Sequence, residues 1–174
     1  MYKVLIVDDE VLVRIGLKNT IDWEEIGFTV VGEASNGEQG YAQFLKLNPD
    51  VVITDIKMPK QDGLWLTDKI HKENKDTKIL VLTCYDEFQF ARTALKNGAT
   101  DYMLKSEIVD DELIALMKRF KTTLDDSSAG QSVIPNKHHN QNAIKRSLLN
   151  DLIKVKFNFD EKLLFRFEEQ NYQL

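Results

Sequence analysis

Six side chains that could carry out chemistry close runs of apolar residues in this sequence or directly follow them. They are Asp8, Asp9, Glu10, Asp55, Thr83 and Lys105. Carboxylates that crowd together repel one another, so a site that holds three of them requires a cation. Oxygen ligands with room for water suit Mg²⁺, which takes one or two carboxylates together with phosphate oxygens. If these residues converge, the sequence predicts a magnesium site.

The same set of residues predicts a reaction at that site. A carboxylate beside Mg²⁺ can act as a nucleophile toward phosphorus and form an aspartyl phosphate. Asp55, at the end of the apolar run Val51–Thr54, is the candidate nucleophile. Lys105 would supply a compact positive charge to the phosphoryl oxygens, and the hydroxyl of Thr83 could donate a hydrogen bond to one of them.

Each of these residues taken alone also has an ordinary structural interpretation. The acidic residues 8–10 could cap a following helix, because carboxylates are favoured in a first helical turn. Asp55 could be a turn residue, Thr83 an ordinary strand threonine and Lys105 a solvated lysine. Only their occurrence together, each at the end of an apolar run, favours a functional site.

Five short apolar runs alternate with five segments of helical period. The runs are Lys3–Val7, Phe28–Ala34, Val51–Thr54, Lys78–Thr83 and Asp101–Leu104. Most are continuously apolar, which is typical of strands buried on both faces of a parallel sheet. The pattern predicts an α/β fold, with a five-stranded parallel, doubly wound, flavodoxin-like (βα)5 sheet. In such a sheet ligands bind outside the carboxyl ends of the strands.

The helical segments should turn an apolar side toward the sheet. For the first of them we expect that side to include Val11, Ile15 and the segment Leu17–Ile21. Trp23 and Trp65 are expected to be packing residues.

The periodic pattern ends near residue 124. We expect the α/β domain to span residues 1–124 and the polar residues 125–142 to form a linker. Residues 143–174 should be a short helical extension, the start of a following domain that is cut off. One helical face of this extension would carry Ile144, Leu148, Leu149, Leu152 and Ile153.

Composition excludes several classes of protein. The net charge is −5, and no part of the chain has the basic excess that would neutralise a phosphate backbone. No apolar run approaches the roughly 20 residues of a membrane helix, and the N-terminus does not resemble a signal peptide. We therefore expect a cytoplasmic protein without membrane contact.

Cysteine and histidine offer no further site. Cys84 is the only cysteine, which excludes an internal disulfide and CxxC-type sites, and we expect it to be a small buried hydrophobe. His138 and His139 are adjacent in the predicted linker and, without spaced ligands nearby, are expected to be solvated.

Four motifs give the chain a resemblance to a known family. They are "VLIVDDE", "VVITDIKMPKQDG", "ILVLTCYDEF" and "GATDYMLK", in this order and spacing. From Tyr2 to Leu124 the sequence resembles the receiver domain of bacterial two-component response regulators. The segment "IDWEEIGFTVVGEASNGEQG" is similar to the AraC/YesN-type subgroup, whose members usually carry a C-terminal helix-turn-helix output domain.

The resemblance implies roles for the site residues. Asp55 would be the phosphoacceptor, and Asp9, Asp55 and the backbone carbonyl of Lys57 would hold Mg²⁺, with Asp8 acting mainly through metal-bound water. Thr83 and Lys105 would contact the phosphoryl group.

The resemblance also implies a switch and partners. On phosphorylation Thr83 would move toward Asp55, and Tyr102 would turn into the vacated space. The protein would catalyse only its own phosphorylation and dephosphorylation. A sensor histidine kinase would be the phosphodonor, the active form would be a homodimer, and DNA would be bound only through an output domain outside this chain.

The sequence departs from the family after the lysine. The family commonly has proline there, often with a cis bond, whereas this chain has Ser106. A cis bond before a non-proline residue costs about 3 kcal/mol, so we expect a trans bond.

Three other functions remain as alternatives. A phosphatase of the haloacid-dehalogenase type would use Asp8 and Glu10, but its second acidic pair should lie on a later strand, whereas "KSEIVDDE" has its acids in a predicted helix. An unphosphorylated interaction module is disfavoured by the complete set of acids, hydroxyl and lysine. A nucleotide-binding flavodoxin-like domain lacks a glycine-rich phosphate loop.

Overall fold

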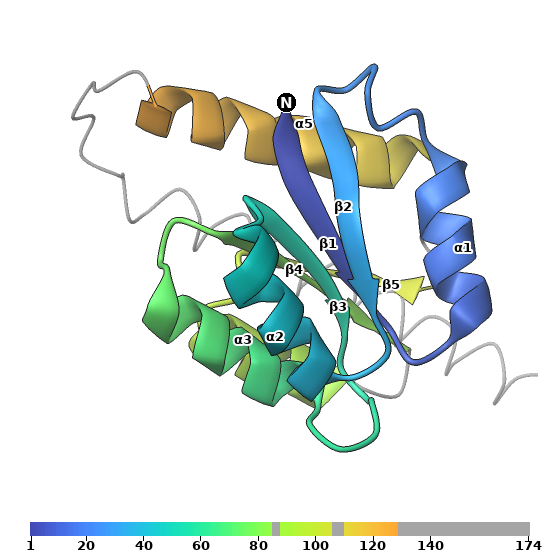
Figure 1. Ribbon diagram of the computed structural model, residues 1–174, viewed down its shortest axis with the longest axis vertical. Coiled ribbons are helices and arrows are strands. Elements are labelled where there is room, and N and C mark those ends of the chain that lie inside the picture. Colours follow the sequence, from blue (N-terminus) through green and yellow to red (C-terminus); the bar gives the residue numbers. More distant parts are fainter. Residues whose placement is uncertain (85–87, 106–109, 129–174) are drawn as a thin grey trace, which may run out of the picture. The chain divides into compact units, whose positions relative to one another are not determined.

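The computed structural model describes residues 1–84, 88–105 and 110–128, in which strands and helices alternate (Figure 1). The strands are β1 (Tyr2–Val7), β2 (Phe28–Ala34), β3 (Val51–Asp55), β4 (Lys78–Thr83) and β5 (Asp101–Leu104). The helices are α1 (Val11–Thr20), α2 (Gly37–Leu47), α3 (Gly63–Glu73), α4 (Phe88–Lys96) and α5 (Asp110–Ser128).

The five strands form one parallel sheet in the order β2-β1-β3-β4-β5. Val7 pairs with Thr54 of β3, and Asp55 pairs with Leu82 of β4. Thr83 in turn lies beside Leu104 of β5. This register brings the carboxyl ends of β1, β3, β4 and β5 to one edge of the sheet. The predicted fold class is confirmed.

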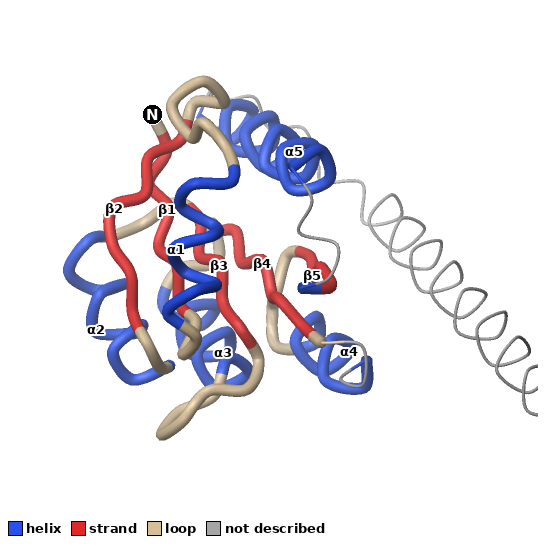
Figure 2. Tube along the Cα trace, turned by 90° about the vertical axis from the view of Figure 1, so that its right-hand side faces the viewer, coloured by secondary structure: helices blue, strands red, loops and turns tan. Residues whose placement is uncertain are grey.

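Two hydrophobic cores lie on opposite faces of the sheet. Val4 and Ile6 of β1 belong to the first core, which they share with side chains of α1 and α5. Leu5 and Val7 belong instead to the second core, with side chains of α2, α3 and α4. Figure 2 shows α5 on one side of the sheet and α2, α3 and α4 on the other. Successive residues of a strand point to opposite faces, so a strand covered on both faces is apolar at every position. For this reason the five strand sequences are mostly continuous apolar runs and do not alternate between apolar and polar residues.

Helix α1 packs with a different side from the one that the sequence suggested. Leu17 and Ile21 are buried, whereas Val11, Leu12 and Ile15 are exposed, so the prediction for Val11 and Ile15 was wrong. Residues two positions apart are separated by about 200° around a helix, so Ile15 lies nearly opposite Leu17. Val11 and Ile15 are four residues apart, and so are Leu17 and Ile21, so each pair could form an apolar side of the helix. Only the packing decides which pair faces the sheet.

The tryptophans are packing residues, as predicted. Trp23 is buried in the first core, and its indole N–H donates to the carbonyl oxygen of Leu17 at 3.1 Å. Trp65 packs against the second core and meets the ring of Tyr41 edge-on, with 5.8 Å between the ring centroids. Cys84, however, is exposed, contrary to expectation. It follows Thr83, the last residue of β4, and so lies beyond the two cores.

Several predictions fall on residues outside the described ranges. These are the peptide bond before Ser106, most of the linker 125–142 with His138 and His139, and the helical extension 143–174. Helix α5 continues through Ser128, four residues past the predicted domain end at Leu124.

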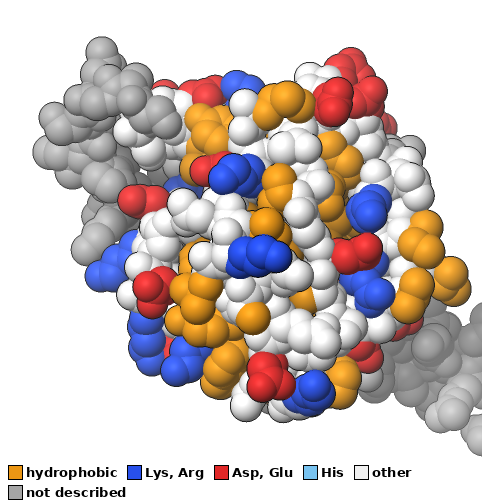
Figure 3. All heavy atoms as spheres, viewed as in Figure 1, with side chains coloured by type: hydrophobic (Ala, Val, Ile, Leu, Met, Phe, Trp, Pro, Cys, Tyr) orange, Lys and Arg blue, Asp and Glu red, His pale blue; other side chains and the backbone are white. Residues whose placement is uncertain are grey.

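On the face that Figure 3 shows, basic and acidic side chains are interspersed rather than gathered by sign. Within the residues that the structure describes, the helices lack the combination of length and hydropathy that crossing a membrane requires.

Candidate metal and phosphoryl site

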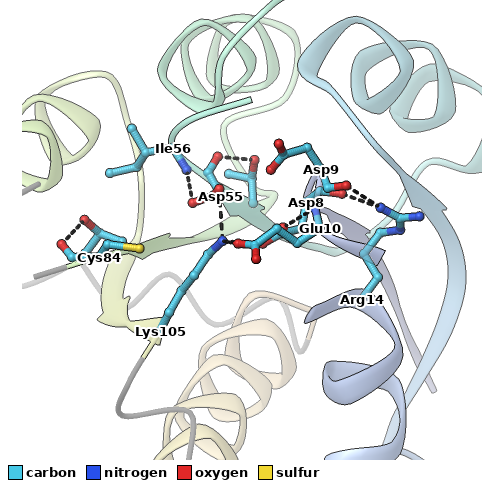
Figure 4. A network of polar contacts seen from close by, with 10 residues as sticks. Asp8, Asp9, Glu10, Arg14, Asp55, Ile56, Cys84 and Lys105 are labelled. Carbon is cyan, nitrogen blue, oxygen red and sulfur yellow. Dashed lines mark hydrogen bonds and ion pairs between the residues drawn. The ribbon is translucent and has the colours of Figure 1, made fainter. Parts of the chain in front are cut away.

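The carboxyl ends of three strands bring charged side chains together (Figure 4). Asp8 and Asp9 follow β1, Asp55 ends β3, and Lys105 follows β5. The carboxylates of Asp8, Asp9 and Asp55 each offer an oxygen, and these oxygens lie within 4.8 Å of one another. Asp8 and Asp55 are buried, whereas Asp9 is exposed. The acidic residues thus converge as the strand ends suggested.

One ammonium group lies among three carboxylates at this site. Lys105 Nζ is 3.0 Å from Asp55 Oδ2, 3.0 Å from Asp8 Oδ2 and 2.9 Å from Glu10 Oε1. The sequence placed Glu10 among the rim acids but gave no reason for a contact with Lys105, which lies 95 residues further along the chain. Each carboxylate therefore receives only a share of one positive charge.

Burial dominates the electrostatics of the aspartates. Loss of solvent raises the pKa of Asp55 from 3.8 to about 6, although its hydrogen bond and ion pair with Lys105 act in the opposite direction. Burial likewise raises the pKa of Asp8. Burial alone would lower the pKa of Lys105, but its close contacts with the carboxylates of Glu10, Asp55 and Asp8 raise it above its usual value. The lysine is thus fully charged, while the carboxylates remain incompletely compensated.

The donor set fits a hard divalent cation. Three carboxylates supply oxygen ligands, the kind that Mg²⁺ prefers. Asp8 Oδ2 is buried and, within the described residues, accepts no hydrogen bond, although Lys105 Nζ lies 3.0 Å away as an ion-pair partner. A buried polar atom without a hydrogen bond is uncommon and calls for an explanation. A cation held by these residues would supply one.

The turn after β1 is held by contacts within the site. The amide of Glu10 donates to Asp8 Oδ1 at 2.9 Å. Glu10 occupies the N-cap position of α1, but its side chain accepts no capping hydrogen bond. Arg14 of α1 donates from Nη1 to the carbonyl oxygens of Asp8 and Asp9, at 2.7 and 3.3 Å (Figure 4). Sequence reasoning missed Arg14, whose only signal was an arginine early in the helix that follows the acids.

The loop after β3 is shaped by a close approach of two backbones. The amide of Gly63 donates to the carbonyl oxygen of Ile56 at 2.8 Å. A Cβ atom on Gly63 would overlap the carbonyl oxygen of Asp55, so only glycine fits here. Asp62 caps α3 by accepting from the amide of Trp65 at 2.7 Å. The start of α3 therefore packs directly against the backbone of Asp55 and Ile56.

A pocket of about 570 Å³ opens beside Asp9. Its lining includes Lys57 and Met58 from the loop after β3, together with Phe90 of α4. The ammonium of Lys57 lies 6.0 Å from the centroid of the Phe90 ring.

Thr83 and Tyr102 lie on the neighbouring strands β4 and β5. Thr83 is fully buried, and its hydroxyl donates to the carbonyl oxygen of Cys84 at 3.1 Å. Tyr102 of β5 pairs with Val81 of β4 and packs, partly buried, against the second core.

Comparison with known proteins agrees with this geometry. The family described as "Response regulator receiver domain" matches residues 4–128. The transcriptional regulatory protein YesN of Bacillus subtilis is 38% identical over 125 residues, which cover 68% of this chain and 34% of YesN. Staphylococcal response regulatory proteins match over 53% of their length, so the chain spans about half or less of these curated relatives.

Solved structures of receiver domains are also similar to this chain. The receiver domain of AraT from Geobacillus stearothermophilus superposes with a TM-score of 0.70 at 35% identity, covering 73% of this chain and 98% of that domain. A CheX–CheY–BeF3–Mg²⁺ complex from Borrelia burgdorferi matches with a TM-score of 0.60 at 25% identity, over 70% of this chain and 88% of that one. The chain therefore belongs to the response regulator receiver family and contains the receiver domain of a two-component response regulator.

Proposed function

We propose that this receiver domain accepts a phosphoryl group on Asp55 in a Mg²⁺-dependent reaction. One observation carries the proposal: the buried carboxylate of Asp55 lies beside two further aspartates and shares Lys105 with Asp8. As a receiver the chain is not a conventional enzyme, and its chemistry would be its own phosphorylation and dephosphorylation. The acids of the phosphatase alternative do not form a second pair on a strand, because Asp110, Asp111 and Glu112 lie in α5.

The metal ligands would be Asp9, Asp55 and the backbone carbonyl of Lys57, with Asp8 acting through water. When bound, Mg²⁺ would neutralise charge that builds up on the phosphoryl oxygens. Asp9 is the exposed member of the three aspartates, and it lines the same pocket as Lys57. Their shared position at this pocket supports a role for both residues in binding an ion from solvent.

The chain's own residues would carry out the transfer. An oxygen of Asp55 attacks phosphorus and forms a new P–O bond, while the bond from phosphorus to the donor breaks and its electron pair leaves with the donor. Lys105 Nζ, now shared by three carboxylates, would turn to a phosphoryl oxygen. A phosphohistidine of a sensor histidine kinase or a small acyl phosphate would serve as donor. Hydrolysis of the aspartyl phosphate would restore the carboxylate.

Thr83 and Tyr102 would convert this local change into a switch. The Thr83 hydroxyl would leave the carbonyl of Cys84 and donate to a phosphoryl oxygen. Tyr102, on the adjacent strand, would turn into the vacated space and change the surface formed by α4, β5 and α5. That surface would then pair with a second copy of the chain to form a homodimer.

Partners would contact the domain beside the site. Helix α1 begins directly after the acidic turn and exposes Val11, Leu12 and Ile15, apolar side chains that a docked protein such as the histidine kinase could cover. By similarity to the transcriptional regulator YesN, the whole protein would control transcription from the cytoplasm. DNA would be bound by an output domain that follows the receiver (1–124), the linker (125–142) and the helical segment (143–174).

Mass spectrometry tests the phosphorylation. Incubation with Mg²⁺ and acetyl phosphate should add one phosphoryl group to the wild-type chain. Asp55→Asn should remain unlabelled, while Asp76→Asn, an exposed aspartate remote from the cluster, should be labelled like wild type. Equal labelling of Asp55→Asn would exclude Asp55 as the acceptor.

Sedimentation tests the switch. Beryllofluoride with Mg²⁺ should shift the wild-type protein toward a dimer and leave Asp55→Asn unchanged. A shift of both variants, or of neither, would count against phosphorylation-controlled dimerisation.

A further inference from the structure

The acidic turn of the site is tied to two other elements by one side chain. Arg14 of α1 donates from Nη1 to the carbonyl oxygens of Asp8 (2.7 Å) and Asp9 (3.3 Å). Its Nε donates to Glu33 Oε2 of β2 at 3.2 Å. The Arg14 side chain is only 13% exposed, so solvent competes little for these contacts. The guanidinium therefore joins α1, β2 and the turn.

We propose that Arg14 is a positioning residue for the metal site and that Glu33 holds it in place. This inference rests on the proposed function, because it concerns the Mg²⁺ that the phosphoryl transfer requires. Arg14 touches no carboxylate of the site. It acts on the backbone of Asp8 and Asp9, whose peptide planes determine where their carboxylates point.

The turn needs such an external support. Asp8, Asp9 and Asp55 carry like charges within 4.8 Å, and the single ammonium of Lys105 compensates them only in part. Repulsion between these carboxylates favours conformations of the turn in which they lie further apart. The side chain of Glu10, at the helix N-cap, adds no capping bond. Arg14 binds the backbone carbonyl oxygens of the turn with a positively charged group and so stabilises the turn against this repulsion.

Arginine suits this task better than lysine does. Its guanidinium presents several N–H donors in a fixed plane, so one side chain can serve the turn and Glu33 at the same time. A lysine ammonium is a compact, strongly hydrated charge and would lose this fixed geometry. Residues that orient metal ligands from outside the ligand set typically change metal affinity by about 10-fold or more when substituted.

Helix α1 also provides a matched control. Lys18 pairs with the other oxygen of Glu33, Oε1, at 3.6 Å, but its side chain is 44% exposed. It lies one helical turn beyond Arg14. Lys18→Gln therefore removes the same charge from the same helix and from the same acidic partner, yet leaves the turn untouched.

A Mg²⁺ titration followed by NMR amide shifts, without any phosphodonor, tests the proposal. Arg14→Gln should weaken Mg²⁺ binding about 10-fold. Glu33→Gln should weaken it less, and Arg14→Lys should restore only part of the affinity. Lys18→Gln should stay within about twofold of wild type, as expected for an exposed ion pair. Thermal unfolding without Mg²⁺ identifies variants that merely lose stability.

Labelling by acetyl phosphate separates positioning from chemistry. For Arg14→Gln the Mg²⁺ concentration at half-maximal rate should rise about 10-fold, while the rate at saturating Mg²⁺ stays near the wild-type value. The proposal is overturned if Arg14→Gln binds Mg²⁺ like wild type, if Lys18→Gln weakens binding equally, or if Arg14→Lys restores full affinity. The proposed function fails separately if the wild-type chain binds Mg²⁺ but takes up no phosphoryl group.

Discussion

Lys105 Nζ lies 3.0 Å from Oδ2 of Asp55, and the two residues come from the ends of different strands, β5 and β3. The contact gives the buried carboxylate its cationic partner, which it shares with Asp8 and Glu10. The pKa of Asp55 still rises to about 6, because burial outweighs its share of the ammonium. This imbalance makes the site receptive to a further cation.

Removal of the lysine should raise the pKa of Asp55 above 6. The hydrogen bond and charge of Lys105 both favour the ionised carboxylate, so Lys105→Gln leaves burial with less opposition. Carbon-13 NMR of the aspartate carboxyl groups measures this pKa directly. Lys72→Gln, which breaks an exposed ion pair with Asp68, should leave it unchanged. An unchanged or lower pKa in Lys105→Gln would contradict the interpretation.

The same lysine should matter for phosphoryl transfer. Loss of one preorganised donor at a developing charge typically costs about 100-fold in rate. Labelling of Lys105→Gln by acetyl phosphate should slow by about that factor at saturating Mg²⁺.

The contribution of Asp55 to protein stability should fall as pH rises from about 4 to about 6. The folded state holds the Asp55 proton more tightly than the unfolded state, whose pKa is near 3.8, so between these values the folded state binds more protons. The stabilisation that the Asp55 proton provides is therefore lost as pH rises through this window and stays absent above it. The shift corresponds to about 3 kcal/mol at most.

The substitution Asp55→Asn should remove the loss of stability that ionisation of Asp55 causes. The variant should be more stable than wild type at pH 8 by up to about 3 kcal/mol, and the difference should shrink at pH 4. Urea unfolding across this pH range provides the measurement, with Asp76→Asn expected to follow wild type. Equal stability of Asp55→Asn and wild type at pH 8 would refute the burial argument.

Two glycines should respond to alanine in opposite directions. A methyl group on Gly63 would overlap the carbonyl oxygen of Asp55, so Gly63→Ala should destabilise the fold by about 1 to 3 kcal/mol and weaken Mg²⁺ binding. Gly16, within α1, has open space around its Cβ position, so Gly16→Ala should stabilise the protein by about 0.5 to 1 kcal/mol. Denaturant unfolding measures both changes, and equal effects would show that the close approach at Gly63 is unimportant.

Glu10 should slow the reaction that its neighbours promote. Its carboxylate accepts from Lys105 at 2.9 Å and adds negative charge where a phosphate must arrive, although its side chain is 60% exposed. Glu10→Gln should therefore speed labelling by acetyl phosphate up to about fivefold, the range expected for an exposed ion pair. Glu38→Gln, which loses only a surface contact with Lys60, is the matched control. A slower Glu10→Gln would show that Glu10 assists the transfer.

Much of the fold could be predicted from local pattern. A strand covered on both faces must be apolar at successive positions, so runs such as Val51–Thr54 indicate a parallel sheet without any alignment. Parallel strands end at one edge, which is enough to group Asp8, Asp55 and Lys105. The pattern did not decide which side of α1 is buried, because Ile15 and Leu17 both fit a helical stripe.

By itself the sequence determined the order of strands and helices, the acids at the strand ends and the family to which the chain belongs. Only the tertiary structure decided that Arg14 supports the acidic turn, that Glu10 contacts Lys105 and that Cys84 is exposed. The reason is physical. Apolar periodicity is a local property that burial imposes on each element, whereas a side-chain contact depends on how two elements pack, and no single segment encodes that.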